Sequence, residues 1–203
     1  DYSIRDKVAV VYAEGTILDG EGENGMIGDM RYTKILRNLR KDANVTAIVL
    51  RVNSPGGSAM ASENIWREVM LAREAGKPVI ASMGDYAASG GYYIACGADT
   101  IIAQPKTLTG SIGVFLVIPN ATELLNQKIG INFDSVKTTD MATGITPFFD
   151  LTDKEQRYIR QRTDNMYETF LARVAEGRNI SRDSVHEIAQ GRVWIGRQAL
   201  DIG

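Results

Sequence analysis

A serine surrounded by small residues is the strongest candidate for chemistry in this sequence. Ser89 lies in the run GDYAASGGYY (84–93), between a predicted strand and a predicted helix. A serine nucleophile needs such an uncrowded, sharply turned position, because the carbonyl that it attacks must come within about 3 Å. The N–H of Gly90 would then face the oxyanion, as in other strand-to-helix serine turns. The alternative interpretation is a helix that packs closely through small residues.

Two other glycine-containing segments flank this run in the sequence. Residues 53–58 (NSPGGS) follow one predicted strand and precede a helix, where paired glycines and free helix N–H groups suit an oxyanion or a phosphate. A tight turn without a ligand is the alternative, and a P-loop is excluded because no Gly-Lys-Ser/Thr follows. Residues 109–114 (TGSIGV) predict a turn at the same edge of the sheet. Ser111, Ile112 and Gly113 are either structural or line a substrate groove.

A serine nucleophile also needs a group that accepts its proton. The single histidine, His186, is predicted to lie in a helix near the end of the chain, where a solvated side chain is the simpler interpretation. The other route is a lysine that burial keeps neutral. Three lysines are candidates, although each lies in polar or turn-like sequence that does not indicate burial: Lys106, Lys128 and Lys137.

Strands and helices must alternate along the chain to position these segments. The patterns predict strands at 7–12, 47–52, 78–83 and 99–103, and helices at 29–42, 58–75 and 87–97. This order is typical of right-handed crossovers and a mostly parallel sheet. A capping box of Thr152 and Glu155 predicts a long helix that ends at Gly177, and Ser181 caps one more.

Length and composition limit the classes of protein to consider. The chain has 203 residues, of which 44% are hydrophobic and 24% charged, so we expect one globular domain over residues 1–203. The net charge of −2 and the absence of a Lys/Arg block argue against nucleic acid as a partner.

The single cysteine, Cys96, excludes an internal disulfide framework and is expected to be a packed core thiol. No pattern for a metal or cofactor site is found, and no apolar run approaches the roughly 20 residues of a membrane helix.

Together the segments resemble the signal peptide peptidase A (protease IV) family of serine peptidases. The likeness covers nearly the whole chain. Its most specific part is the pairing of the NSPGG run with ASGGY (88–92) and TGSIG (109–113), and it extends to GRVWIG (191–196). This resemblance implies the Clp protease/crotonase-like α/β fold, with repeated β-β-α units, a mostly parallel sheet and a long C-terminal helix.

The resemblance also implies roles for particular residues. Ser89 would be the nucleophile, and Gly57 and Gly90 would donate their N–H groups to the oxyanion. The base in this family is a lysine, and no cofactor takes part. In the short form of the family this lysine lies shortly before a proline that precedes the long helix. Ala142 and Met141 occupy that place before Pro147, and Lys137 lies too early in the sequence.

The long form of the family explains this departure, because its two tandem halves divide the machinery. The C-terminal half gives the serine and the N-terminal half gives the lysine. This chain resembles the C-terminal half alone, so we expect a fragment with little or no activity by itself. Its partners would be apolar peptide substrates, the N-terminal half and further copies in a homo-oligomer.

The same resemblance implies where the parent protein works. We expect it to be anchored in the bacterial inner membrane with its catalytic part on the periplasmic side, and the fragment itself to be soluble. The parent would degrade signal peptides left in the membrane after secretion.

Two alternatives remain open from the sequence. One is a crotonase-type acyl-CoA enzyme, for which only Asp85 offers a carboxylate near the expected site. The other is a non-catalytic scaffold half that keeps its Ser-Gly-Gly segment for packing.

Overall fold

The computed structural model describes residues 6–203, which form two compact units. Unit 1 runs up to Val114 and continues from Tyr167 to Gly203, and unit 2 comprises residues 115–166. This division does not test the expectation of one peptidase domain over residues 1–203, which stays a prediction.

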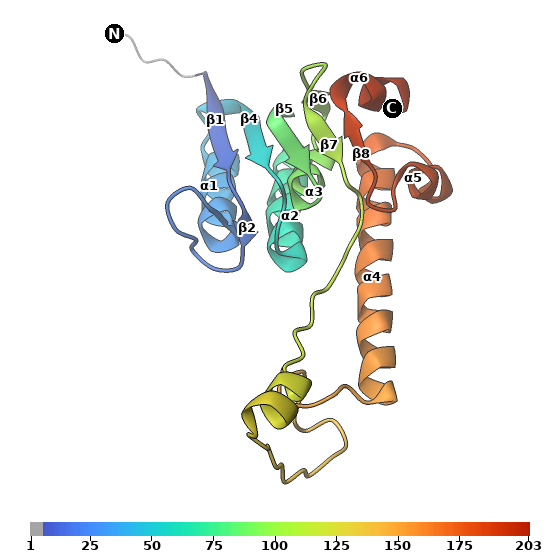
Figure 1. The fold of residues 1–203 in the computed structure, drawn as a ribbon. Coiled ribbons are helices and arrows are strands. Elements are labelled where there is room, and N and C mark those ends of the chain that lie inside the picture. The colour runs from blue at the N-terminus through green and yellow to red at the C-terminus, as the bar shows by residue number, and fades with distance from the viewer. Residues whose placement is uncertain (1–5) are drawn as a thin grey trace. The chain divides into compact units, whose positions relative to one another are not determined.

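A six-stranded sheet forms the centre of unit 1 (Figure 1). Its order is β1-β4-β5-β7-β8, with β6 also paired to β5, and every pair is parallel except β7 with β8. The strands are β1 (Lys7–Glu14), β4 (Val45–Ser54), β5 (Val79–Ala88), β6 (Thr100–Ile102), β7 (Leu108–Gly110) and β8 (Val193–Ile195). A second, two-stranded sheet pairs β2 (Ile17–Leu18) with β3 (Ile27–Gly28). The predicted mostly parallel sheet is confirmed.

Helices follow the strands in the predicted order. They are α1 (Asp29–Lys41), α2 (Ala59–Glu74), α3 (Gly90–Cys96), α4 (Asp153–Arg178), α5 (Arg182–Ile188) and α6 (Gly196–Asp201). The part of α4 from Tyr167 onward belongs to unit 1, and unit 2 also contains a π-helical segment, η1 (Leu124–Ile129). Among the helices of residues 6–203, none combines the length and the apolar character that crossing a membrane requires.

The main core lies between one face of the sheet and the helices. Strand residues alternate between the two faces, and the parallel register places Val11, Leu50 and Ala81 side by side on the inner face. All three are buried, and Leu36 of α1 and Ile65 of α2 belong to the same cluster. The amphipathic patterns in the sequence therefore mark the helix faces that pack on the sheet.

A second core joins α4 to α2, α3 and α5. Phe170, Leu171 and Val174 of α4 are at most 3% exposed and belong to a cluster with Trp66 and Tyr93. The apolar residues that the sequence spaces along this helix are therefore buried in its unit 1 part. Tyr158 and Met166, which continue the same spacing, belong to unit 2 and are 48% and 41% exposed.

The predicted starts of α4 and α5 are confirmed, and the predicted end of α4 is wrong. Thr152 N–H donates to Glu155 Oε2 (2.9 Å), and Glu155 N–H donates to Thr152 Oγ1 (3.3 Å), so the capping box is present. Ser181 caps α5 by accepting from the Ser184 N–H at 3.0 Å. Gly177, predicted to end α4, lies inside the helix. A Cβ there would lie 2.1 Å from the Cys96 carbonyl oxygen, so the glycine allows α4 to approach the end of α3.

Candidate active site

Ser89 lies at the junction of β5 and α3, in a strained backbone conformation. Its φ is 52° and its ψ is −123°, a positive φ that residues other than glycine rarely adopt. The Ser89 N–H donates to the Gly110 carbonyl of β7 (2.9 Å), and the Ser89 carbonyl accepts from the Tyr93 N–H (2.9 Å). Strain of this kind concentrates at functional sites, where the surroundings hold a side chain in place. Ser89 itself is half-buried.

The segment Gly56-Gly57 meets the Ser89 segment in space. A Cβ on Gly56 would lie 2.6 Å from the Gly90 nitrogen and 2.9 Å from the Ser89 Cβ. A Cβ on Gly90 would lie 3.2 Å from the Gly57 nitrogen. The sequence predicted the two glycine segments separately, and the structure brings them into contact around the serine.

The backbone around Gly57 and Gly90 leaves the N–H group of each outside the regular hydrogen bonding of the bridge and of α3. Ile17 N–H donates to the Gly56 carbonyl and Ser58 N–H donates to the Ile17 carbonyl, each at 2.9 Å. This pattern bridges Ile17 with Gly57 and turns the Gly57 N–H toward the opposite side, because alternate N–H groups of an extended segment point in opposite directions. Gly90 begins α3, where an N–H has no acceptor within the helix. Two such donors beside a hydroxyl can stabilise an oxyanion.

The strand that leads to Ser89 contains a bulge that the sequence analysis missed. Val52 pairs with Met83 but Ser54 pairs with Ala87, so residues 84–86 of β5 lie opposite Asn53 alone. The Asn53 Oδ1 accepts from the N–H groups of Asp85 (3.0 Å) and Tyr86 (3.3 Å). These N–H groups have moved out of the regular ladder, and the asparagine side chain replaces their partners.

Two buried threonines hold the same segment from its other side. Thr107 Oγ1 donates to the Gly84 carbonyl (2.8 Å), and Thr109 Oγ1 donates to the Ala87 carbonyl (2.9 Å). Both threonines are at most 3% exposed. The backbone before Ser89 is therefore fixed by side chains on both sides. Thr109 begins the 109–114 segment, but no pattern in the sequence indicated these hydrogen bonds, because their acceptors are carbonyl groups far away in the chain.

We expect the Asn53 contact to matter for the reactivity of Ser89. Asn53→Leu removes the acceptor and should destabilise the fold by about 1–3 kcal/mol, because two backbone donors lose their partner. It should also slow covalent labelling of Ser89 about tenfold or more, since a misplaced nucleophile loses productive geometry. Asn53→Asp keeps an acceptor oxygen and should retain most of the rate.

Labelling of Ser89 by a fluorophosphonate and thermal melting of both variants test this prediction. The labelling is measured in the longer protein that we propose below to contain this chain. Equal labelling rates for Asn53→Leu and the unmodified protein would contradict it.

Ser111, Ile112 and Gly113 directly follow β7, next to the Ser89 segment. Ser111 has a positive φ of 48°, and its N–H donates to the Arg192 carbonyl (2.8 Å). The Ile112 carbonyl accepts from the Gly191 N–H (2.9 Å), and the Ile112 side chain is 3% exposed in the second core. Ile112 can therefore offer a groove only its backbone. Lining of a substrate groove by these residues stays a prediction.

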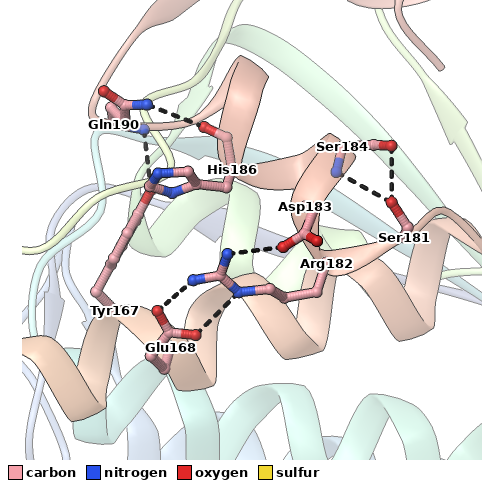
Figure 2. Close-up of polar contacts among 8 residues, drawn as sticks. All are labelled: Tyr167, Glu168, Ser181, Arg182, Asp183, Ser184, His186 and Gln190. Carbon is pink, nitrogen blue, oxygen red and sulfur yellow. Dashed lines mark hydrogen bonds and ion pairs between the residues drawn. The ribbon is translucent and has the colours of Figure 1, made fainter.

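His186 packs against α4, as Figure 2 shows. Its Nδ1 lies 2.9 Å from the Tyr167 Oη, and the same oxygen accepts from the Gln190 N–H at 3.3 Å. Beside it, Arg182 forms an ion pair with Glu168 of α4 and lowers the pKa of that carboxyl group by hydrogen bonding. These contacts give His186 a structural role between α4 and α5.

The three candidate lysines are all exposed, which differs from the burial that a neutral lysine requires. Lys106 lies in the turn before β7. Lys128 and Lys137 belong to unit 2, where the Lys137 Nζ lies 5.8 Å from the centre of the Phe149 ring. None of the three therefore has the surroundings expected of a general base in this structure.

Comparisons with known proteins identify the family of this chain. A family model described as "Peptidase family S49" matches residues 71–203, which include Ser89 and Gly90. The chain belongs to peptidase family S49. This is a family of serine peptidases that includes protease IV, so the family expected from the sequence is confirmed. The acyl-CoA enzyme alternative gains no support from membership of this family.

Six curated relatives between 32% and 44% identical carry protease or peptidase names, and several are much longer than this chain. "Protease 4" of Haemophilus influenzae is 44% identical over all of the chain, and that of Salmonella typhi is 43% identical over 98% of it. The chain spans only 32% and 33% of their respective lengths. A "putative protease" of Synechocystis is 34% identical, and the chain covers 69% of it.

A solved structure shows the fold. A ClpP1 mutant from Listeria monocytogenes matches 96% of this chain with a TM-score of 0.60 at 16% identity, over 86% of its own chain. The expected Clp protease-like α/β fold, with its mostly parallel sheet and the long helix α4, is therefore confirmed.

Proposed function

We propose that this chain carries the nucleophile and the oxyanion hole of a serine endopeptidase of the Ser/Lys dyad type. The observation that supports this most strongly is the meeting of Gly57 and Gly90 beside the strained Ser89. A packing role alone would explain the glycines but not a serine with a positive φ, because glycine would adopt that conformation at lower cost.

The proposed reaction assigns one step to each group. The Ser89 Oγ attacks the carbonyl carbon of the peptide bond, and its proton passes to a neutral lysine amine. The N–H groups of Gly57 and Gly90 donate to the oxyanion, and losing one such donor typically costs about 2.7–4 kcal/mol of transition-state stabilisation. The resulting ammonium returns the proton to the leaving amine. Water then hydrolyses the acyl-enzyme by the same proton transfers.

We place the lysine in an upstream half of a longer protein. The positions before Pro147 hold Ala142 and Met141, and the candidate lysines of this chain are exposed. The two Protease 4 relatives are about three times as long as the region that they share with this chain, so they have room for a second copy of the fold. By itself, the chain should show little or no peptidase activity.

The proposed substrates are signal peptides left in the membrane after secretion. A 32% identical relative from Enterococcus faecium carries the name "Putative signal peptide peptidase SppA", which supports this class. Unit 2 exposes Phe115, Leu116 and Val117 by 83%, 58% and 75%. Such adjacent apolar side chains indicate a surface that other molecules cover, as in a homo-oligomer. A membrane-anchored parent with its catalytic part outside the cytoplasm fits these substrates.

Covalent labelling with a fluorophosphonate tests the divided dyad. The 203-residue chain alone should label at Ser89 slowly or not at all, and co-expression with the upstream half should produce labelling. Lys137→Ala should leave that labelling unchanged. Labelling of the chain alone that Lys137→Ala abolishes would place the base in this chain, and no labelling under any condition would favour a scaffold role.

A further inference from the structure

One face of the sheet in unit 1 is apolar and exposed, and we call it the outer face. The register places Val10 beside Val49 and Val49 beside Ile80, all on the side opposite the buried row of Val11. On β1, Val8, Val10 and Tyr12 are 61%, 50% and 64% exposed. Ile102 of β6 is on the same side, because it pairs with Ser82, and is 53% exposed.

An open apolar face is unusual for parallel strands. Parallel sheets are nearly always covered on both faces, and their strands are buried on both sides. Here α1 and α2 lie on one side of the sheet (Figure 1) and share the core with its inner face. The β1 side chains of the outer face remain exposed. A contiguous apolar surface of this kind marks a site of interaction.

Arg51 adds a charge to the middle of the outer face. It pairs with Tyr12 on one side and Ser82 on the other, and its Nη1 donates to the Ser82 Oγ (2.9 Å) and the Met83 carbonyl (2.7 Å). Both acceptors are uncharged, so the guanidinium keeps its positive charge on this face. A partner with apolar side chains and one carboxylate opposite Arg51 would complement the surface.

We propose that the outer face docks the upstream half of the longer protein, the half that supplies the lysine. This inference rests on the proposed function. The outer face extends to the candidate active site, because Asn53 lies on it at the end of β4. The Asn53 Oδ1 accepts hydrogen bonds from the N–H groups of Asp85 and Tyr86, which shortly precede Ser89. A domain seated on the outer face therefore lies next to the place where the base is needed.

The lengths of the relatives favour this occupant over a second copy of the chain. This chain covers 32% and 33% of the two Protease 4 relatives. A protein of that length therefore contains further residues, in the same polypeptide, that can cover the outer face. A second copy would have the same Ala142 and Met141 where the short form of the family has its lysine.

Alkylation of an introduced cysteine tests the docking without using catalysis. Val10→Cys places a thiol on the outer face, and Met30→Cys places one on α1, where Met30 is 57% exposed. The native Cys96 does not compete, because it is fully buried and burial raises its pKa to about 12. Its resistance to alkylation also shows that each sample is folded.

We compare maleimide alkylation of the 203-residue chain alone with that of the chain co-expressed with the upstream half. With that half present, the thiol of Val10→Cys should react at least about tenfold more slowly, because it is covered. Met30→Cys should react at the same rate in both samples. Equal rates for Val10→Cys would overturn the proposal, as would equal slowing of Met30→Cys.

Two other outcomes separate this proposal from the function on which it rests. Protection of Val10→Cys in the chain alone, increasing with its concentration, would show that a second copy covers the face and would overturn the proposal. Protection by the upstream half without fluorophosphonate labelling of Ser89 would support the docking and contradict the divided dyad.

Discussion

Replacing Ser89 by glycine should abolish covalent labelling and at the same time raise the melting temperature. Labelling is lost because no hydroxyl remains, and removing the nucleophile of a serine peptidase costs on the order of 10⁶ in kcat. The fold should gain stability because glycine adopts φ 52° and ψ −123° without the strain that serine carries. That strain is worth about 1–3 kcal/mol.

The size of this gain can be bounded. Glycine loses about 0.5–1 kcal/mol through its greater freedom in the unfolded chain, which leaves a net stabilisation of about 1 kcal/mol. For a chain of this size that corresponds to a melting temperature higher by about 2–4 °C. Ser89→Ala is the matched control, because it loses the hydroxyl but keeps a Cβ and therefore the strain. A melting temperature that falls in Ser89→Gly would contradict a strained nucleophile.

A methyl group at Gly56 should disable the site without touching the hydroxyl. The new Cβ would lie 2.6 Å from the Gly90 nitrogen and 2.9 Å from the Ser89 Cβ, closer than real Cβ contacts come. Because Gly56 has a φ of 100°, the backbone would be strained as well. Forcing the two glycine segments apart moves the proposed oxyanion donors, and one lost donor alone costs about 10²–10³ in kcat.

Gly76→Ala is the control for Gly56→Ala. Gly76 also has a positive φ, of 79°, but a Cβ there meets nothing within 4 Å. It should lower stability by about 1 kcal/mol through backbone strain alone and leave labelling of Ser89 unchanged. Comparable labelling by Gly56→Ala and Gly76→Ala, measured in the assembled protein, would show that close contact between the glycine segments is not needed.

Much of this fold follows from local patterns in the sequence. The β-branched runs predicted β4 and β6, and the capping residues Thr152 and Ser181 predicted where α4 and α5 begin. The strand at 99–103 was also expected to be buried, but in β6 Ile102 is 53% exposed. The glycines beside Ser89 were recognisable because few residues allow such turns. These signals are local, since each depends on residues close together in the chain.

The missed features depend on partners that are distant in sequence. β5 was expected to end at 83 but continues to Ala88, because Asn53, Thr107 and Thr109 hold its irregular part. An asparagine and two threonines give no such signal by themselves. The end of α4 was misplaced for a related reason, since Gly177 serves contact with the Cys96 carbonyl and not a stop.

The hydrogen bonds around Ser89 also determine when this part of the fold can form during synthesis. The Ser89 N–H is bound by the Gly110 carbonyl, and the next residue, Ser111, is bound in turn by Arg192 of the segment leading into β8. A growing chain emerges from the ribosome N-terminus first, so the early strands can collapse long before Arg192 is made. The backbone around Ser89 is therefore completed among the last parts of this chain, and a polypeptide that stops before Arg192 would lack these hydrogen bonds.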